Sequence, residues 1–147
     1  MCSVSPDAKR YKEFQKNGAV KLFMPPWTLP ELQAVGEFVR KRNPNQMPLT
    51  PKDISERFHA VGGIFRHVFD PHFKIVLVAQ SEAISELDPK KFKLNKLDRD
   101  LPQVSHYVAQ YIVTTEGDNA YQEANLDLVS DGVREAVAAQ FPYFDKK

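Results

Sequence analysis

The sequence predicts an α+β protein that is mostly helical and that ends in a small β-hairpin followed by a helix. Two segments carry complete helix-start signals, apolar residues then recur at helical spacing, and the last third of the chain changes to the alternating pattern of strands. With 147 residues, 42% of them hydrophobic, the chain is long enough to bury one core and too short for a large multidomain enzyme.

The clearest helix start lies at Thr28-Leu29-Pro30-Glu31. The threonine offers an N-cap hydroxyl, the proline suits the first turn, and the glutamate stands where a capping box needs a carboxylate. The spacing of Leu32, Val35 and Val39 then predicts a helix that runs to about Arg42.

The same signal recurs at Thr50-Pro51-Lys52-Asp53 and predicts a second helix. Its buried stripe is formed by Ile54, Phe58 and Val61, at positions i, i+4 and i+7. Gly62-Gly63 should end this helix, because glycine readily leaves the helical conformation.

Two more helices are expected in the middle third of the chain. Ile64–Phe69 fits a short helix that Asp70-Pro71 closes. Phe73–Leu87 has the length and the Ala, Glu and Ser content of a helix, although Ile75–Val78 has strand propensity.

The remaining segments of the first two thirds are shorter or more polar. Asp7 can cap a polar helix to about Lys16, and the apolar run Val20–Met24 predicts a short buried strand. Pro89–Pro102 is dense in Lys and Asp and predicts a linker or surface loop.

The last third predicts a hairpin and a final helix. Residues 106–113 alternate in character, and the turn at 116–119 leads into a second run, Tyr121–Leu128. Ser130 can cap a helix. The apolar positions on one face of that helix are Val133, Val137 and Phe141.

Charge and cysteine content exclude several classes of protein. The 20 basic and 19 acidic residues give a net charge of +1, so no bulk field draws the chain to nucleic acid or anionic lipid. Cys2 is the only cysteine, which excludes an intrachain disulfide and a cysteine-rich metal cage and fits a reducing compartment. The most apolar stretch, Ile75–Ala79, is too short to span a bilayer, so we expect no membrane contact.

Gly62-Gly63-Ile64-Phe65-Arg66-His67 is the most distinctive stretch. Two glycines allow a sharp break between helices, and the short helix that follows would project Arg66, whose donor fork suits phosphate oxygens. The alternative is an ordinary surface arginine after a turn.

Other chemistries have weaker support. His67, Asp70 and His72 suggest a metal site, but Pro71 would break a helix between the two histidines. Acidic residues such as Asp98 and Asp100 invite a metal-dependent nuclease, although they fall in the charged linker. No phosphate loop, dinucleotide fingerprint or nucleophile elbow is present in the sequence, and we identify no complete catalytic set.

A small DNA-binding module remains an alternative from another class. Three short helices around a Gly-Gly turn can mimic a helix-turn-helix. However, Phe65, Val68 and Phe69 make the third helix too apolar to face a groove.

Several phrases occur in one order that resembles the Crinkler and retrotransposon hot spot family. They cover most of the chain, from about Ser3 to Phe141. The phrases are Ser5-Pro6-Asp7, Arg10-Tyr11-Lys12-Glu13-Phe14, Met24-Pro25-Pro26-Trp27-Thr28-Leu29-Pro30-Glu31-Leu32, Arg57-Phe58, Gly62-Gly63-Ile64-Phe65-Arg66-His67-Val68-Phe69 and Val104-Ser105-His106.

This resemblance implies part of a P-loop ATPase module related to the AAA+ and STAND classes, which in the family precedes a nuclease-like or kinase-like effector region. Residues 1–27 would end the ATPase core, residues 28–88 would form an AAA+/STAND-like helical lid, and residues 89–147 would form a linker, hairpin and terminal helix. Trp27, Gly62 and Gly63 would be structural motif residues. Ser5 and Arg66 would be nucleotide sensors, with Arg66 over the γ-phosphate.

The sequence also departs from the family pattern. The phosphate loop and the acidic strand that holds magnesium are absent, so the intact module would use ATP and Mg²⁺ whereas this chain alone should not bind ATP tightly. Phe65 stands where the family phrase more usually has Pro.

We therefore expect a fragment that is catalytically inactive alone, with an interaction or regulatory role. Its partner would be a missing N-terminal ATPase half or another protein, with weak nucleic-acid contact as a further option. The resemblance implies an effector-like protein of the nucleus or host-cell nucleus, with secretion as an open alternative.

Overall fold

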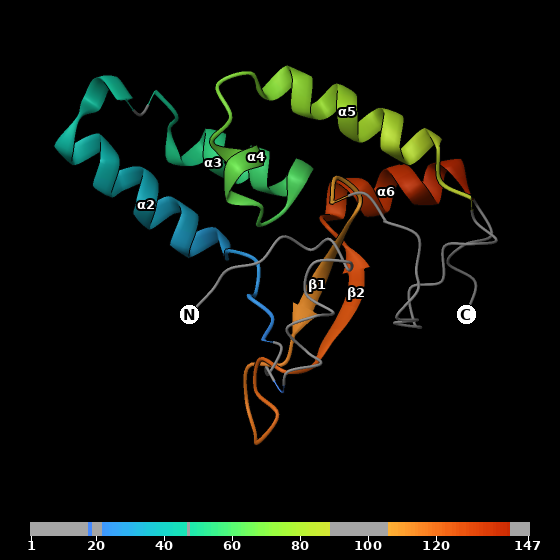
Figure 1. The fold of residues 1–147 in the computed structure, drawn as a ribbon. Helices are drawn as coiled ribbons and strands as arrows, with labels where there is room; N and C mark the ends of the chain where they lie inside the picture. Colours follow the sequence, from blue (N-terminus) through green and yellow to red (C-terminus); the bar gives the residue numbers. More distant parts are fainter. Residues whose placement is uncertain (1–17, 19–21, 47, 89–105, 142–147) are drawn as a thin grey trace. The chain divides into compact units, whose positions relative to one another are not determined.

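The computed structural model describes Gly18 and residues 22–46, 48–88 and 106–141 (Figure 1). These residues form an α+β arrangement that is mostly helical, with one two-stranded antiparallel sheet, as predicted. The elements are α2 (Leu29–Arg42), the 3-10 turn η1 (Pro44–Gln46), α3 (Pro51–Val61), α4 (Phe65–Val68), α5 (Phe73–Ser85), β1 (Ala109–Val113), β2 (Ala124–Leu128) and α6 (Asp131–Gln140).

The chain divides into two compact units. One contains the described parts of Pro26–Ile112 and Asn125–Lys147, to which all helices of the described residues belong. The other contains Val113–Ala124 and the described residues up to Pro25. In this smaller unit the Thr114 N–H donates to the Glu123 carbonyl at 2.9 Å, which continues the hairpin pairing toward its turn.

Both predicted capping boxes are confirmed. In α2 the Thr28 side chain accepts from the Glu31 N–H, and the Glu31 carboxylate accepts from the Thr28 N–H at 2.7 Å. Thr50 and Asp53 repeat the arrangement at the start of α3. These hydrogen bonds lower the pKa of both carboxyl groups, chiefly through the Thr28 backbone for Glu31 and the Thr50 hydroxyl for Asp53.

The predicted third and fourth helices also form, each shorter than expected. α4 has only four residues, and Phe69 is its C-cap. The segment with mixed propensity is the helix α5, whose buried residues are Val76, Gln80 and Ile84. Their spacing of four places them on one face, so burial in the tertiary structure overrides the strand propensity of Ile75–Val78.

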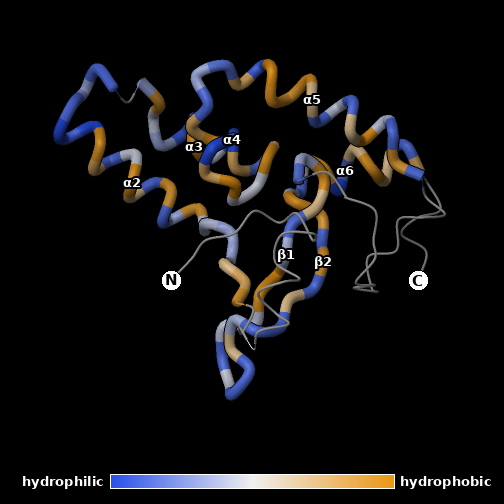
Figure 2. The backbone as a smooth tube through the Cα atoms, in the orientation of Figure 1, coloured by the Kyte–Doolittle hydropathy of each residue, from blue (hydrophilic) through white to orange (hydrophobic). Residues whose placement is uncertain are grey.

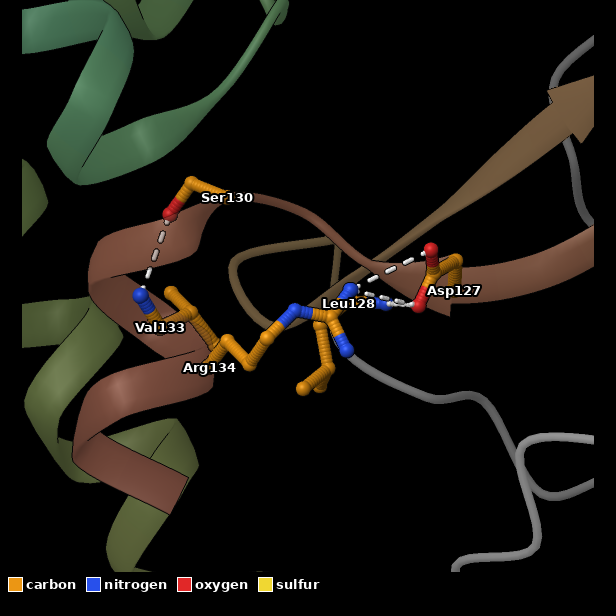
Figure 3. Close-up of polar contacts among 5 residues, drawn as sticks. All are labelled: Asp127, Leu128, Ser130, Val133 and Arg134. Atoms are coloured by element: carbon orange, nitrogen blue, oxygen red, sulfur yellow. Dashed lines mark hydrogen bonds and ion pairs between the residues drawn. The ribbon is translucent and has the colours of Figure 1, made fainter. Parts of the chain in front are cut away.

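α6 begins as the sequence predicts. The Ser130 hydroxyl accepts from the Val133 N–H at 3.1 Å (Figure 3) and donates to the carbonyl of Ala60 at 2.8 Å. One side chain thus caps α6 and joins it to α3.

The larger unit has two hydrophobic clusters. Figure 2 shows that hydrophobic residues recur along its helices and strands. Tyr107 packs against both. The first consists of Ile84, Val108, Ala109, Leu128, Val129, Val133 and Val137. The second consists of Leu32, Ile54, Val61, Val68 and Val76.

Part of the N-terminal prediction is wrong. Residues 22–24 form no strand, and Leu22 and Met24 are 58% and 85% exposed. The Phe23 N–H donates to the Tyr121 carbonyl at 2.7 Å, but residues 22–24 are not part of a strand. A short apolar run does not supply the neighbouring strand that a sheet requires.

A smaller difference concerns the start of a predicted strand. The second hairpin strand begins at Ala124 instead of Tyr121, because Tyr121 has φ +63 and belongs to the turn.

The predicted helix from Asp7 to Lys16 and the linker Pro89–Pro102 lie outside the described residues. Within the described ranges, we find no helix that is long and apolar enough to cross a membrane.

Because Ser130 makes two hydrogen bonds, its replacement should destabilise the fold more than the loss of an ordinary helix cap does. Ser130→Ala should lower the free energy of unfolding by about 2 kcal/mol, because it removes both the cap and the bond to Ala60. Thr50→Ala, which removes only an exposed cap, should cost about 1 kcal/mol in the same urea titration. Equal losses in the two variants would contradict this account.

Candidate functional site

The two most distinctive sequence phrases meet in the structure. The Trp27 N–H donates to the Gly63 carbonyl at 2.9 Å. A Cβ atom on Gly63 would lie 2.1 Å from the Trp27 carbonyl oxygen, so only glycine allows this approach. The segment before α2 is therefore joined, backbone to backbone, to the turn between α3 and α4.

Gly62 makes a second close contact beside the first. It ends α3 with φ +70, and a Cβ there would lie 1.9 Å from the carbonyl oxygen of Val129. The glycine pair therefore ends the helix as predicted and also lets two other backbone segments approach it.

The carbonyl of Ala60 completes this region. It accepts from the Gln80 side-chain amide at 3.1 Å and from Ser130 at 2.8 Å. The same Gln80 amide donates to the Tyr107 carbonyl at 3.1 Å. We call Ala60–Gly63 the α3 exit. Its residues are bonded to α5 through Gln80, to the start of α6 through Ser130 and to the segment before α2 through Trp27. Gln80 in turn bonds the segment before β1 at Tyr107.

Aromatic side chains cover the α3 exit on the Trp27 side. The rings of Trp27 and Phe65 have centroids 5.3 Å apart, and Phe65 lies 4.7 Å from Phe69. Trp27 and Phe65 remain 41% and 39% exposed. Phe65 directly precedes Arg66 in the chain, so this partly exposed aromatic group leads into the residue that carries the charge.

Arg66 extends into solvent from α4, as the sequence predicts. No described acidic residue forms an ion pair with it. Its charge acts on two neighbouring imidazoles, because it contributes to lowering the pKa of both His67 and His106. The surface here carries a cationic donor fork suited to phosphate or carboxylate oxygens.

His67 is the residue whose importance the sequence does not reveal. It is 4% exposed and stacks on Tyr107 with ring centroids 4.7 Å apart and planes 3° apart. The His106 ring lies 5.2 Å away. Its Nδ1 atom is buried and has no hydrogen-bond partner among the described residues.

This environment keeps His67 neutral. Burial is the main cause that lowers its pKa to about 4, and the charges of His106 and Arg66 act in the same direction. The pKa of His106 is also lowered, first by partial burial and then by Arg66. The imidazole of His67 serves as a flat packing element that joins α4 to the segment before β1.

Arg57, part of one family-like phrase, has a structural place. Its guanidinium donates to the carbonyls of Val68 and Asp70, both at 2.9 Å. It also lies over the Phe73 ring at 4.4 Å from the centroid. Arg57 therefore provides hydrogen bonds to carbonyl groups at and just after the C-terminal end of α4. Its contact with Phe73 also joins this turn to the first residue of α5.

A cavity of about 380 Å³ opens on another side of the α3 exit. Its polar lining includes His59, Gln110, Asp127 and Arg134. Arg134 donates to Asp127 at 3.1 Å and 3.3 Å (Figure 3), so these charges largely satisfy each other. The buried Oε1 of Gln110 accepts no hydrogen bond from the described residues.

Other expected site residues are not described. Ser5, the second sensor expected from the family resemblance, and the linker acids Asp98 and Asp100 lie outside the described ranges. Within those ranges, no group of three His, Cys, Asp or Glu side chains is arranged to hold a metal ion.

Comparison with known proteins returned no matching family model, no matching curated protein and no matching solved structure.

The glycine pair yields a matched test of close approach. Gly62→Ala should lower the free energy of unfolding by more than about 3 kcal/mol, because it adds a clash with Val129 to the strain of positive φ. Gly117→Ala, with φ +86 and no atom within 4 Å of the added Cβ, should cost only about 1 kcal/mol. Urea titrations that give similar costs would contradict the close packing of the α3 exit.

The buried imidazole predicts a pH-dependent stability. A folded-state pKa near 4, below the ordinary 6.5, means that the unfolded chain takes up the proton more readily. The stabilisation is complete above pH 6.5 and is lost as the pH falls toward 4. At pH 4.5 this histidine should cost the fold roughly 2 kcal/mol relative to pH 7.5.

His67→Phe keeps a flat ring and removes the titrating group, so its stability should fall less between pH 7.5 and pH 4.5. His72→Phe, at an exposed position, is the matched control and should follow the parent chain. Urea titrations at the two pH values measure this difference, and a parallel fall in all three proteins would count against a buried neutral His67.

Proposed function

We propose that this chain is a non-catalytic helical module that contacts a phosphate group through Arg66 and regulates the protein that holds that group. In the family it resembles, this part would be the helical lid of an AAA+/STAND-like ATPase. Its partner would be the N-terminal half of such a module or another protein, in the nuclear or host-cell setting that the resemblance implies.

The junction between Trp27 and Gly63 is the observation that carries the proposal. The residues of the resemblance are scattered in sequence, yet Trp27, the glycine pair and Arg66 belong to one small region. A backbone held this closely keeps α4 in a defined position, and α4 carries the exposed Arg66. Fixed orientation is what a phosphate sensor needs, because a guanidinium acts through geometry as well as charge.

The residues of this chain do not fit an ATP site of its own. The sequence has no phosphate loop to cradle the phosphates. The described acids nearest the proposed sensor do not converge as a magnesium site would require. We therefore assign no catalytic step to the chain, and the nucleotide would be held by the partner.

The DNA-binding alternative has less support. α4 is only four residues long, and two of them, His67 and Val68, are buried. A recognition helix needs several exposed side chains in a row to reach base edges. Salt-sensitive retardation of DNA in a gel at low salt would favour this alternative over ours.

A nucleotide titration followed by NMR tests the proposed role of Arg66. With Mg-ATP added to the 147-residue chain, we expect millimolar affinity and amide shifts confined to Phe65–His67. Arg66→Gln should abolish these shifts. Arg42→Gln, which removes another exposed arginine at the end of α2, should leave them unchanged.

Two results would contradict the proposal in different ways. Micromolar, magnesium-dependent affinity would mean that the chain has its own nucleotide site. Shifts that persist in Arg66→Gln, or no shift around Arg66 at any concentration, would remove Arg66 as the phosphate contact.

A further inference from the structure

The first half of α5 exposes several apolar side chains. Ile75, Val78 and Leu77 are 67%, 58% and 38% exposed, whereas Val76 and Gln80 point into the unit and are buried. Figure 2 shows this hydrophobic stretch along the first half of the helix. Adjacent exposed aliphatic side chains on a regular helix commonly mark a contact surface.

The charges of α5 oppose its own dipole. Lys74 lies in the first turn, near the positive end, while Glu82 and Glu86 lie at the negative end. No side chain caps its N-terminus; Asp70 accepts from the N–H of His72, the residue just before the helix. α2 shows the favourable arrangement, with Glu31 in its first turn and basic residues in its last.

A second copy of α5, packed antiparallel, would offset this unfavourable placement of charges. Lys74, Ile75, Val78 and Glu82 lie within one stripe, since α5 turns about 100° per residue. If two copies cross at Val78, Lys74 of each lies level with Glu82 of the other. The positive N-terminal end of α5 in each copy then lies beside the negative C-terminal end of α5 in the other. Ile75 and Val78 of both copies lie in the contact between these two ends.

The geometry points to self-association of this chain through α5, with two copies packed antiparallel across a two-fold axis at Val78. A two-fold contact uses the same patch on both copies, which a self-complementary charge pattern allows. The patch is one short helix face, so the dimer is weak and concentration-dependent. This inference does not depend on the proposed function.

Sedimentation equilibrium of the full chain over a concentration series tests the association. We expect reversible monomer and dimer with a dissociation constant in the micromolar-to-millimolar range. Val78→Asp should raise it by about tenfold or more, because it buries a carboxylate against an apolar face. Phe38→Asp, on the exposed face of α2, is the control and should leave it unchanged.

A charge exchange tests the direction of packing without altering the apolar residues. Lys74→Glu should weaken the dimer, because it places two carboxylates at the same level. Adding Glu82→Lys to that variant should restore the dimer, since the complementary pattern returns with its sign reversed. Failure of this rescue would overturn the antiparallel arrangement.

Cysteine crosslinking separates antiparallel from parallel packing. In a Cys2→Ser background, Val78→Cys should form a disulfide-linked dimer on oxidation, because the two sulfurs meet at the axis. Ser85→Cys should not, since its two copies would lie about 21 Å apart along the helices. A parallel pair would crosslink at both positions and would contradict the proposal, as would a chain that stays monomeric at millimolar concentration.

Discussion

The close approach of backbones at the α3 exit is the constraint on which the larger unit depends. Gly63 and Gly62 have no side chain, so the Trp27 and Val129 segments lie directly against them. The Ala60 carbonyl accepts from both Gln80 and Ser130, so α5 and α6 are held at the same place. The two hydrophobic clusters lie around this region, and Tyr107 packs against both. The Ala60 carbonyl is thus satisfied twice at the place where several segments meet.

Two surfaces of the larger unit have proposed roles. Arg66 extends from α4, three residues after the glycine pair, and its neighbour Phe65 packs against Trp27. The apolar stripe of α5 faces away from the residues that Gln80 anchors. Neutral His67 fills the space between α4 and Tyr107, where a charged imidazole would be costly. The proposed phosphate contact and the proposed self-association would therefore use residues of two different helices, α4 and α5.

Local signals predicted the helices well because their causes are local. The capping boxes at Thr28 and Thr50 involve residues three apart, and their hydrogen bonds form as expected. Long-range relations were not predictable in this way: nothing in the sequence showed that Ala60 would bond Ser130, 70 residues later, or that His67 would stack on Tyr107. Residues 22–24, the described part of the predicted strand, form no strand, because an apolar pattern cannot show whether a partner strand is present. The glycine pair was distinctive in the sequence, but the sequence did not show that the backbones at Trp27 and Val129 would pack against it.

Native-state amide hydrogen exchange at Trp27 tests the central claim most directly. Trp27 precedes α2 in an irregular segment, where an amide would ordinarily exchange quickly. If the α3 exit holds the unit together, the Trp27 amide, bonded to Gly63, should exchange as slowly as amides in the middle of α3. Exchange as fast as at exposed Leu22 would mean that the junction opens independently and does not support the rest of the fold.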